Sequence, residues 1–158
     1  MEALERGVQF QQNAAMTRIV RSALVPYPAS SLFDLVNDVA RYPEFLPWCA
    51  SAEVMTADAA TVVAALTVQQ GRIRERFVTC NRLRFPERIE LSLVEGPFRR
   101  LAGFWSFTKL GEDGCKVELE LEFEMSRGIV HKAFSGIFGR AAGSLVDAFC
   151  ERARMLHR

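Results

Sequence analysis

The side chains best suited to ligand chemistry lie in one predicted strand, residues 72–83. Ile73 and Phe77 define its apolar face, and side chains alternate along a strand, so Glu75, Thr79 and Asn81 share that inward face. A buried carboxylate needs a partner or a raised pKa. Glu75 is therefore paired, placed at a cavity mouth, or active as a general acid or base. Thr79 and Asn81 hydrogen-bond either a ligand's carbonyl or each other.

Metal and cofactor chemistry has little support in the sequence. Neither His131 nor His157 has a His, Cys or carboxylate at metal-ligand spacing. The chain has no G-x-S-x-G elbow and no glycine-rich phosphate loop. The cysteines stand more than thirty residues apart without a C-x-x-C pair, at positions 49, 80, 115 and 150. We therefore predict no metal site, no nucleotide chemistry and reduced thiols, as in a cytoplasmic protein.

Composition and charge favour one ordinary domain. The 158 residues carry a net charge of +1 and are 49% hydrophobic, which excludes disorder and a dedicated DNA binder. Residues 72–100 hold eight arginines against four glutamates, whereas residues 111–125 hold six acids against one lysine. These segments are either two solvated sheet faces or, for the first, an arginine-rich partner surface. Early charges at Glu2, Glu5 and Arg6 are unlike a signal peptide.

Apolar and polar residues alternate along much of the chain, and this pattern predicts a β-sheet that positions the candidate ligand-binding side chains. A first strand, residues 17–25, ends at Pro26 and Pro28, and Ser30 or Ser31 is expected to cap a following helix. Short connections predict an antiparallel meander of six more strands at 50–57, 61–70, 72–83, 88–95, 100–110 and 115–125.

Residues 128–158 are predicted to form one long helix. Phe134, Phe138, Leu145 and Phe149 lie on one face at helical spacing, and three glycines lie nearly opposite, at positions 136, 139 and 143. Either a backbone, a membrane surface or a partner approaches that glycine face, or the glycines soften the helix and allow a ligand to enter. The predicted fold is α+β: a curved seven-stranded antiparallel sheet around a C-terminal helix, with short helices after the first strand.

Two aromatic segments are candidates for a pocket wall. Residues 42–49 combine four large apolar side chains with two prolines, and the segment is either a core plug or one wall of a pocket. In the strand 100–110, Leu101, Gly103, Trp105 and Phe107 alternate onto one face, and Gly103 is expected to leave room beside the indole. Trp105 is either a core residue or a flat wall for a ring.

Several segments, in order from residue 16 to about 156, carry a family resemblance: Ser22–Tyr27, Leu35–Val39, Tyr42–Pro47, Phe77–Asn81, Gly96–Phe107 and Phe138–Phe149. Here the chain resembles the START-like, helix-grip superfamily, in its coenzyme-Q-binding and oligoketide cyclase/lipid transport branch. The resemblance implies a sheet that grips the C-terminal helix around a hydrophobic tunnel, without a cofactor or demonstrated catalytic residues. Residues 1–15 depart from the family pattern, so we expect a poorly ordered extension, with Met16 as an alternative start, before one ligand-binding domain at 16–158.

The resemblance leaves three functions open, because the fold is more uniform than the activities. Members of the branch resemble ubiquinone chaperones that support respiration, or ribosome association toxins. A polyisoprenoid quinone or related lipid, with transient contact to a membrane surface, would occupy a tunnel lined by Phe33, Tyr42, Phe45, Trp48, Leu66, Phe77, Thr79, Asn81, Trp105, Phe107, Phe134 and Phe138. Binding to the large (50S) ribosomal subunit would use Arg72, Arg74, Arg76, Arg99 and Arg100. A polyketide cyclase or dehydratase would use Glu75 as general base.

Overall fold

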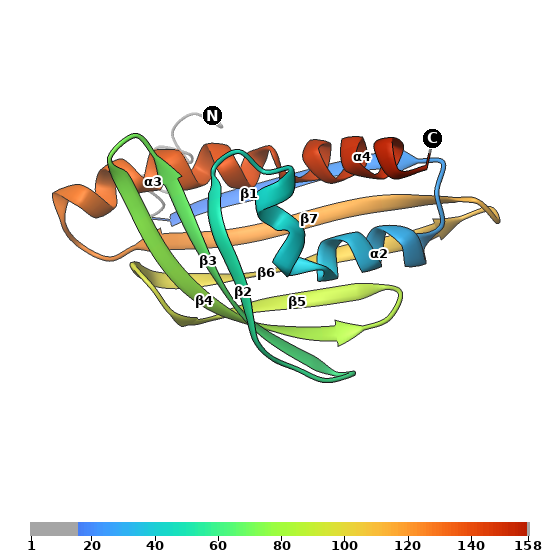
Figure 1. Cartoon of the computed structure of the whole chain (residues 1–158), viewed down its shortest axis with the longest axis horizontal. Helices are drawn as coiled ribbons and strands as arrows, with labels where there is room; N and C mark the ends of the chain where they lie inside the picture. The colour runs from blue at the N-terminus through green and yellow to red at the C-terminus, as the bar shows by residue number, and fades with distance from the viewer. Residues whose placement is uncertain (1–15, 158) are drawn as a thin grey trace, which may run out of the picture.

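The computed structural model describes residues 16–157, which build one antiparallel sheet and the helices that pack on it (Figure 1). The seven strands are β1 (Met16–Val25), β2 (Cys49–Ala57), β3 (Thr61–Gln70), β4 (Ile73–Arg84), β5 (Arg88–Glu95), β6 (Phe98–Leu110) and β7 (Gly114–Met125). Their order is β1-β7-β6-β5-β4-β3-β2, so the first strand pairs with the last, and β1 and β2 are the edge strands. The predicted fold class is confirmed, and the prediction for residues 1–15 lies outside the described residues.

The connection from one sheet edge to the other contains the short helices. After β1, the chain forms α2 (Ala29–Asn37) and the 3₁₀ helix η1 (Val39–Glu44) before it enters β2. Leu32, Phe33 and Val36 form the buried stripe of α2. The predicted serine cap is wrong: Pro28 is the N-cap of α2, and no side chain caps this end. Its fixed φ, −62°, suits a helix entry without a serine hydroxyl.

Alternation along β7 divides the sheet into two faces, as the sequence predicted. Side chains from Cys115 to Phe123 at every second position are buried beneath the helices, while the intervening glutamates stay partly exposed on the outer face. Those glutamates meet arginines from neighbouring strands, with Arg99 Nη1 3.4 Å from Glu124 Oε2 and Arg100 Nη2 3.6 Å from Glu122 Oε1. The basic and acidic segments thus neutralise each other locally across the outer face.

The C-terminal segment is two helices rather than the predicted single one. α3 (Ile129–Gly143) and α4 (Leu145–Leu156) follow each other along one side of the sheet, with a break at Ser144 (Figure 1). The Ser144 hydroxyl donates to the Ala141 carbonyl at 2.8 Å and so competes for a helical acceptor. Gly143, a poor helix former, precedes it. Within residues 16–157, no helix is long and apolar enough to cross a membrane.

Aromatic rings fill the space between sheet and helices in two groups. Near α3, Phe138 packs edge-on against Phe98 and Phe123 at centroid distances of 4.9 and 4.8 Å. Near α4, Phe149 packs against Tyr42 and Trp105, each at 5.3 Å. Edge-to-face pairs of this kind add to the burial of large apolar surfaces. The cavity described below is lined by members of both groups.

Gly103 is required by the sheet itself. A Cβ at this position would stand 2.1 Å from the Glu120 carbonyl oxygen and 2.8 Å from Leu121 Cα, both on the neighbouring strand β7. The nearest obstacle is therefore the β7 backbone and not the Trp105 indole, which corrects the expectation from sequence. Glycine here permits a close approach of β6 and β7.

Candidate ligand-binding site

An apolar cavity lies between the inner face of the sheet and the helices. Its volume is about 80 Å³, on a scale on which one water needs about 10–15 Å³. By that measure the space holds roughly five to eight waters, about the volume of a substituted six-membered ring. Its wall is built by Val39, Tyr42, Trp48, Ala64, Leu66, Phe77, Thr79, Asn81, Leu91, Leu101, Trp105, Leu121, Phe138, Ala141, Ala142, Leu145 and Phe149.

The cavity exists because small side chains share its wall with large ones. Ala141 and Ala142 stand at the end of α3, next to the break at Ser144, and Ala64 faces the cavity from β3. An alanine leaves unfilled the volume that a leucine or phenylalanine at the same position would occupy. Leu145, the first residue of α4, also lines the cavity and stays half-buried. The helix break therefore forms part of the cavity wall.

Most of the predicted tunnel residues line this cavity: Tyr42, Trp48, Leu66, Phe77, Thr79, Asn81, Trp105 and Phe138. The other four pack elsewhere in the core. Phe33 lies edge-on to Phe85 and Phe107, Phe45 packs against Phe149, and Phe134 contacts Phe98 and Phe138. The segment 42–49 is both a pocket wall and a core plug, because Tyr42 and Trp48 line the cavity while Leu46 is buried in the core.

The lining residues that sequence reasoning missed are mainly aliphatic. Strand parity places Leu91, Leu101 and Leu121 on the inner face, and helical spacing places Leu145 and Phe149 on the buried arc. Those patterns mark a residue as inward-facing, but they do not distinguish a cavity wall from filled core. Val39, Ala64, Ala141 and Ala142 complete the set, and no type-specific signal marks them.

The polar side chains of the cavity are few and specifically arranged. Thr79 Oγ1 donates a hydrogen bond to Asn81 Oδ1 at 2.9 Å, so the two residues bond each other. Asn81 is buried, with 7% of its surface exposed. The Tyr42 hydroxyl donates to the Val36 carbonyl. Burial, with a smaller effect of Cys49 and Asp38, raises the pKa of Tyr42 and keeps the phenol neutral.

Glu75 shares the inner face of β4 with Phe77 and Thr79, as strand parity predicted. It is half-buried and lies outside the cavity lining. In the part of the chain that the structure describes, Glu75 forms no ion pair, and no group of His, Cys, Asp and Glu side chains could hold a metal ion. The position resembles the mouth placement expected from sequence more than that of a general base.

The candidate ribosome-binding arginines project from the outer side of the molecule. Arg76 Nη1 lies 3.6 Å from Glu95 Oε2, and Arg74 donates to Gln69 Oε1 on β3. Arg72 is exposed at the turn between β3 and β4. Together with the Arg99 and Arg100 pairs described above, most of these charges are already balanced by a neighbouring acid.

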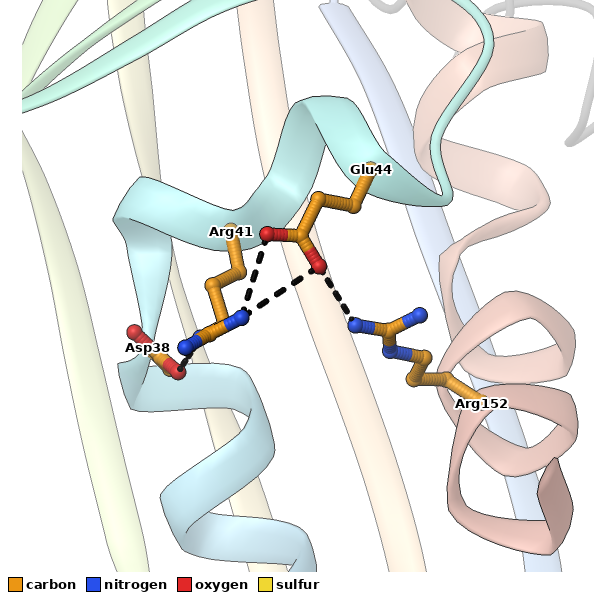
Figure 2. A network of polar contacts seen from close by, with 4 residues as sticks. All are labelled: Asp38, Arg41, Glu44 and Arg152. Carbon is orange, nitrogen blue, oxygen red and sulfur yellow. Dashed lines mark hydrogen bonds and ion pairs between the residues drawn. The ribbon is translucent and has the colours of Figure 1, made fainter. Parts of the chain in front are cut away.

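A polar network ties η1 to α4 beside the cavity (Figure 2). Arg152 of α4 donates to Glu44 Oε1 at 2.7 Å, and Arg41 lies 3.2 Å from both Glu44 Oε2 and Asp38 Oδ2. The Arg152 guanidinium also stands over the Phe45 ring, 4.9 Å from its centroid. Both joined elements line the cavity, so the network holds two of its walls together.

Comparison with known proteins gives concordant results. Residues 25–150 match the family described as polyketide cyclase/dehydrase and lipid transport. The ribosome association toxin RatA of Pseudomonas aeruginosa is 48% identical over 141 residues, covering 89% of this chain and 98% of that protein. The mitochondrial coenzyme Q-binding protein coq10 of Schizosaccharomyces pombe is 30% identical over 144 residues, covering 87% of each. The crystal structure of the Zhui aromatase/cyclase from Streptomyces shares the fold, with a TM-score of 0.79 at 16% identity over 90% of this chain and 96% of that one.

Proposed function

We propose, since the chain belongs to the polyketide cyclase/dehydrase and lipid transport family, that it binds a hydrophobic small molecule in the cavity and carries it without converting it. The observation that supports this most is the cavity itself, a ring-sized space with almost wholly apolar walls. Such sites bind through burial of apolar surface, and a few fixed polar groups set the orientation.

Binding is favoured over catalysis by the chemistry of the lining. Acid–base catalysis needs a titratable group within reach of the reacting atom. Among the described residues, no carboxylate, imidazole, ammonium or guanidinium group belongs to the cavity wall, and the Tyr42 hydroxyl is already bonded to a carbonyl. The remaining candidate base, Glu75, lies outside the lining. A polyketide cyclase reaction therefore has weaker support than carriage.

An isoprenoid quinone is the ligand we propose. The coenzyme Q-binding protein among the relatives supports this choice, and the aromatic side chains of Trp105, Phe138 and Phe149 in the cavity wall suit contact with a quinone ring. The cavity has no room for a long isoprenoid tail, so the tail would leave past the half-buried residues of the wall, among them Trp48, Leu66 and Leu145.

The position of the tryptophans allows a direct test. The chain's two tryptophans, Trp48 and Trp105, both line the cavity. A ubiquinone with one isoprene unit should therefore quench their fluorescence saturably, and organic extraction of the purified protein followed by mass spectrometry should recover a quinone.

A matched pair of variants on α3 separates cavity binding from surface binding. Ala142→Leu fills the cavity and should raise the apparent dissociation constant from quenching at least tenfold. Ala133→Leu adds the same side chain at an exposed position and should leave that constant unchanged. No saturable quenching, or equal quenching in both variants, would contradict carriage in this cavity.

Association with the large ribosomal subunit is a second candidate, supported by the 48% identical relative named a ribosome association toxin. It would place the protein in the cytoplasm. Of the five candidate arginines, Arg72 in the β3–β4 turn and Arg74 at the start of β4 carry no ion pair among residues 16–157, so their charges are available to phosphates. Co-sedimentation with purified subunits should fall as the salt concentration rises, and it should also fall in the double variant Arg72→Glu/Arg74→Glu. It should not fall in the control Arg88→Glu, because the Arg88 guanidinium of the wild-type protein stacks on Phe104. Binding indifferent to salt and to both variants would count against this role.

A further inference from the structure

We infer that Asn81 sets the chemical class of the ligand: the cavity takes a neutral ring whose carbonyl oxygen accepts a hydrogen bond from the Asn81 amide. This inference rests on the proposed function and narrows it. It begins with the bond from Thr79 Oγ1 to Asn81 Oδ1 at 2.9 Å. The hydroxyl occupies the acceptor end of the amide and thereby orients the donor end, the Nδ2 group, away from Thr79.

The donor end of the Asn81 amide has no hydrogen-bond partner among the described residues. Within residues 16–157, the bond from Thr79 is the single hydrogen bond of the Asn81 side chain. Asn81 is nevertheless buried and belongs to the cavity wall. The Nδ2 atom is not one of the fully buried atoms that lack a partner, so it remains accessible, and an occupant that displaces water from it is favoured if it supplies an oxygen lone pair.

The rest of the lining excludes a charged occupant. The other hydroxyl in the wall, that of Tyr42, donates to the Val36 carbonyl. In the part of the chain that the structure describes, no basic side chain lines the cavity to pair with an anion. A carboxylate or phosphate brought into this space would lose its hydration without compensation. Fatty acids and phospholipid headgroups are therefore poor occupants, whereas a quinone or an aromatic ketone is a good one.

Strand register places the amide next to an aromatic wall. Asn81 pairs with Leu91 across β4 and β5, and Leu91 pairs with Gly103 of β6. Trp105 lies two residues beyond Gly103 on the same inner face. Leu91 and Trp105 line the cavity together with Asn81. A flat ring can lie there with its edge toward Asn81 and its face toward apolar side chains.

The inference is tested with three probes of nearly equal size. Tetramethyl-1,4-benzoquinone and 1,2,4,5-tetramethylbenzene differ in the two carbonyls, and 2,4,6-trimethylbenzoate supplies an anion. The fully substituted quinone also has no free ring position for addition of the four cysteine thiols. Dissociation constants are measured by ligand-observed NMR at pH 7 with the full chain. We expect the quinone to bind about tenfold more tightly than the hydrocarbon, as one hydrogen bond provides, and the benzoate to bind more weakly than either.

Variants assign the preference to the Thr79–Asn81 pair. Asn81→Leu should abolish the quinone preference while it retains hydrocarbon binding, and Thr79→Val should reduce it because the amide loses its orienting partner. Thr67→Val makes the same change at a buried threonine outside the lining and should leave the preference intact. Far-UV circular dichroism checks that each variant folds.

The outcomes distinguish this inference from the proposed function. If no probe binds, the proposed function fails and the inference fails with it. If quinone and hydrocarbon bind the wild-type protein equally, or the preference persists in Asn81→Leu, the cavity is a hydrophobic site but Asn81 does not select its ligand. Tighter binding of the benzoate would overturn the inference directly. The wild-type comparison needs no variant, so the test stands even if a substitution unfolds the chain.

Discussion

Replacement of two glycines in α3 should stabilise the protein. Gly136 and Gly139 occupy interior positions of the helix. A Cβ at Gly136 would stand 3.5 Å from Arg140 Nη1, and one at Gly139 would stand 3.8 Å from Phe123 Cζ, both ordinary contact distances. Glycine costs about 0.8–1.0 kcal/mol relative to alanine in a helix interior, largely because alanine loses less backbone entropy on folding. Gly136→Ala/Gly139→Ala should therefore raise the free energy of unfolding by about 2 kcal/mol.

This change is measured by urea unfolding, with far-UV circular dichroism as the signal. The urea concentration at the midpoint should rise while the m-value stays unchanged. For a domain of this size the melting temperature should rise by about 4–8 °C. Gly111→Ala is the matched control. It also adds a methyl into open space, but Gly111 has a φ of +63°, so alanine should destabilise by about 1 kcal/mol.

The same double variant tests why the glycines are present. If they soften α3 for ligand entry, the tetramethylbenzoquinone should be released more slowly from Gly136→Ala/Gly139→Ala. Stopped-flow measurement of the recovery of tryptophan fluorescence gives the rate of release. Unchanged or faster release would refute softening and leave close approach by a backbone, a membrane surface or a partner as the explanation. A variant that is less stable than wild type would refute the reasoning about available space.

Three further predictions follow from packing and electrostatics. Gly103→Ala should destabilise the fold by about 3 kcal/mol, because its Cβ would meet the Glu120 carbonyl at 2.1 Å; a urea midpoint within error of wild type would contradict this. A double-mutant cycle of Glu44→Gln and Arg152→Met should give a coupling of about 0.5–1 kcal/mol that weakens in 1 M salt, because the 2.7 Å pair is partly exposed; a salt-independent coupling would be inconsistent with an ion pair. Burial raises the pKa of Cys49 to about 11 from an ordinary value of 9.0. The unfolded chain therefore loses this proton first, so stability should fall between about pH 9 and 11, and Cys49→Ala should reduce that slope; an unchanged slope would exclude this thiol as its source.

Local patterning was sufficient to predict the strands and the inward face of β4. The alternation along β7 has period two over its whole length, and a strand with such a pattern can bury only one face. The same rule placed Glu75, Thr79 and Asn81 on one side of β4 before their neighbours were known. Turn residues between the strands set an antiparallel meander, because short connections cannot cross over to a parallel strand.

The sequence could not separate cavity wall from filled core. Phe107 and Trp105 are both aromatic, both inward-facing and both buried, yet only Trp105 lines the cavity. That distinction depends on the curvature of the sheet and on where α3 and α4 cross it, which result from packing between residues far apart in the chain. The wall positions at Ala64, Ala141 and Ala142 depend on what stands opposite them, and sequence patterning contains no such information.

The sequence by itself determined the fold class, the faces of the strands and the polar pair that points inward, because periodicity and turn chemistry act between near neighbours. Only the tertiary structure decided that Thr79 bonds Asn81, that the outer arginines meet glutamates of adjacent strands, and that Ser144 divides the C-terminal helix. Each of these depends on the distance between particular atoms after the chain has packed. A hydrogen bond or ion pair exists only within a few ångströms, and the pattern of residue types does not specify that separation.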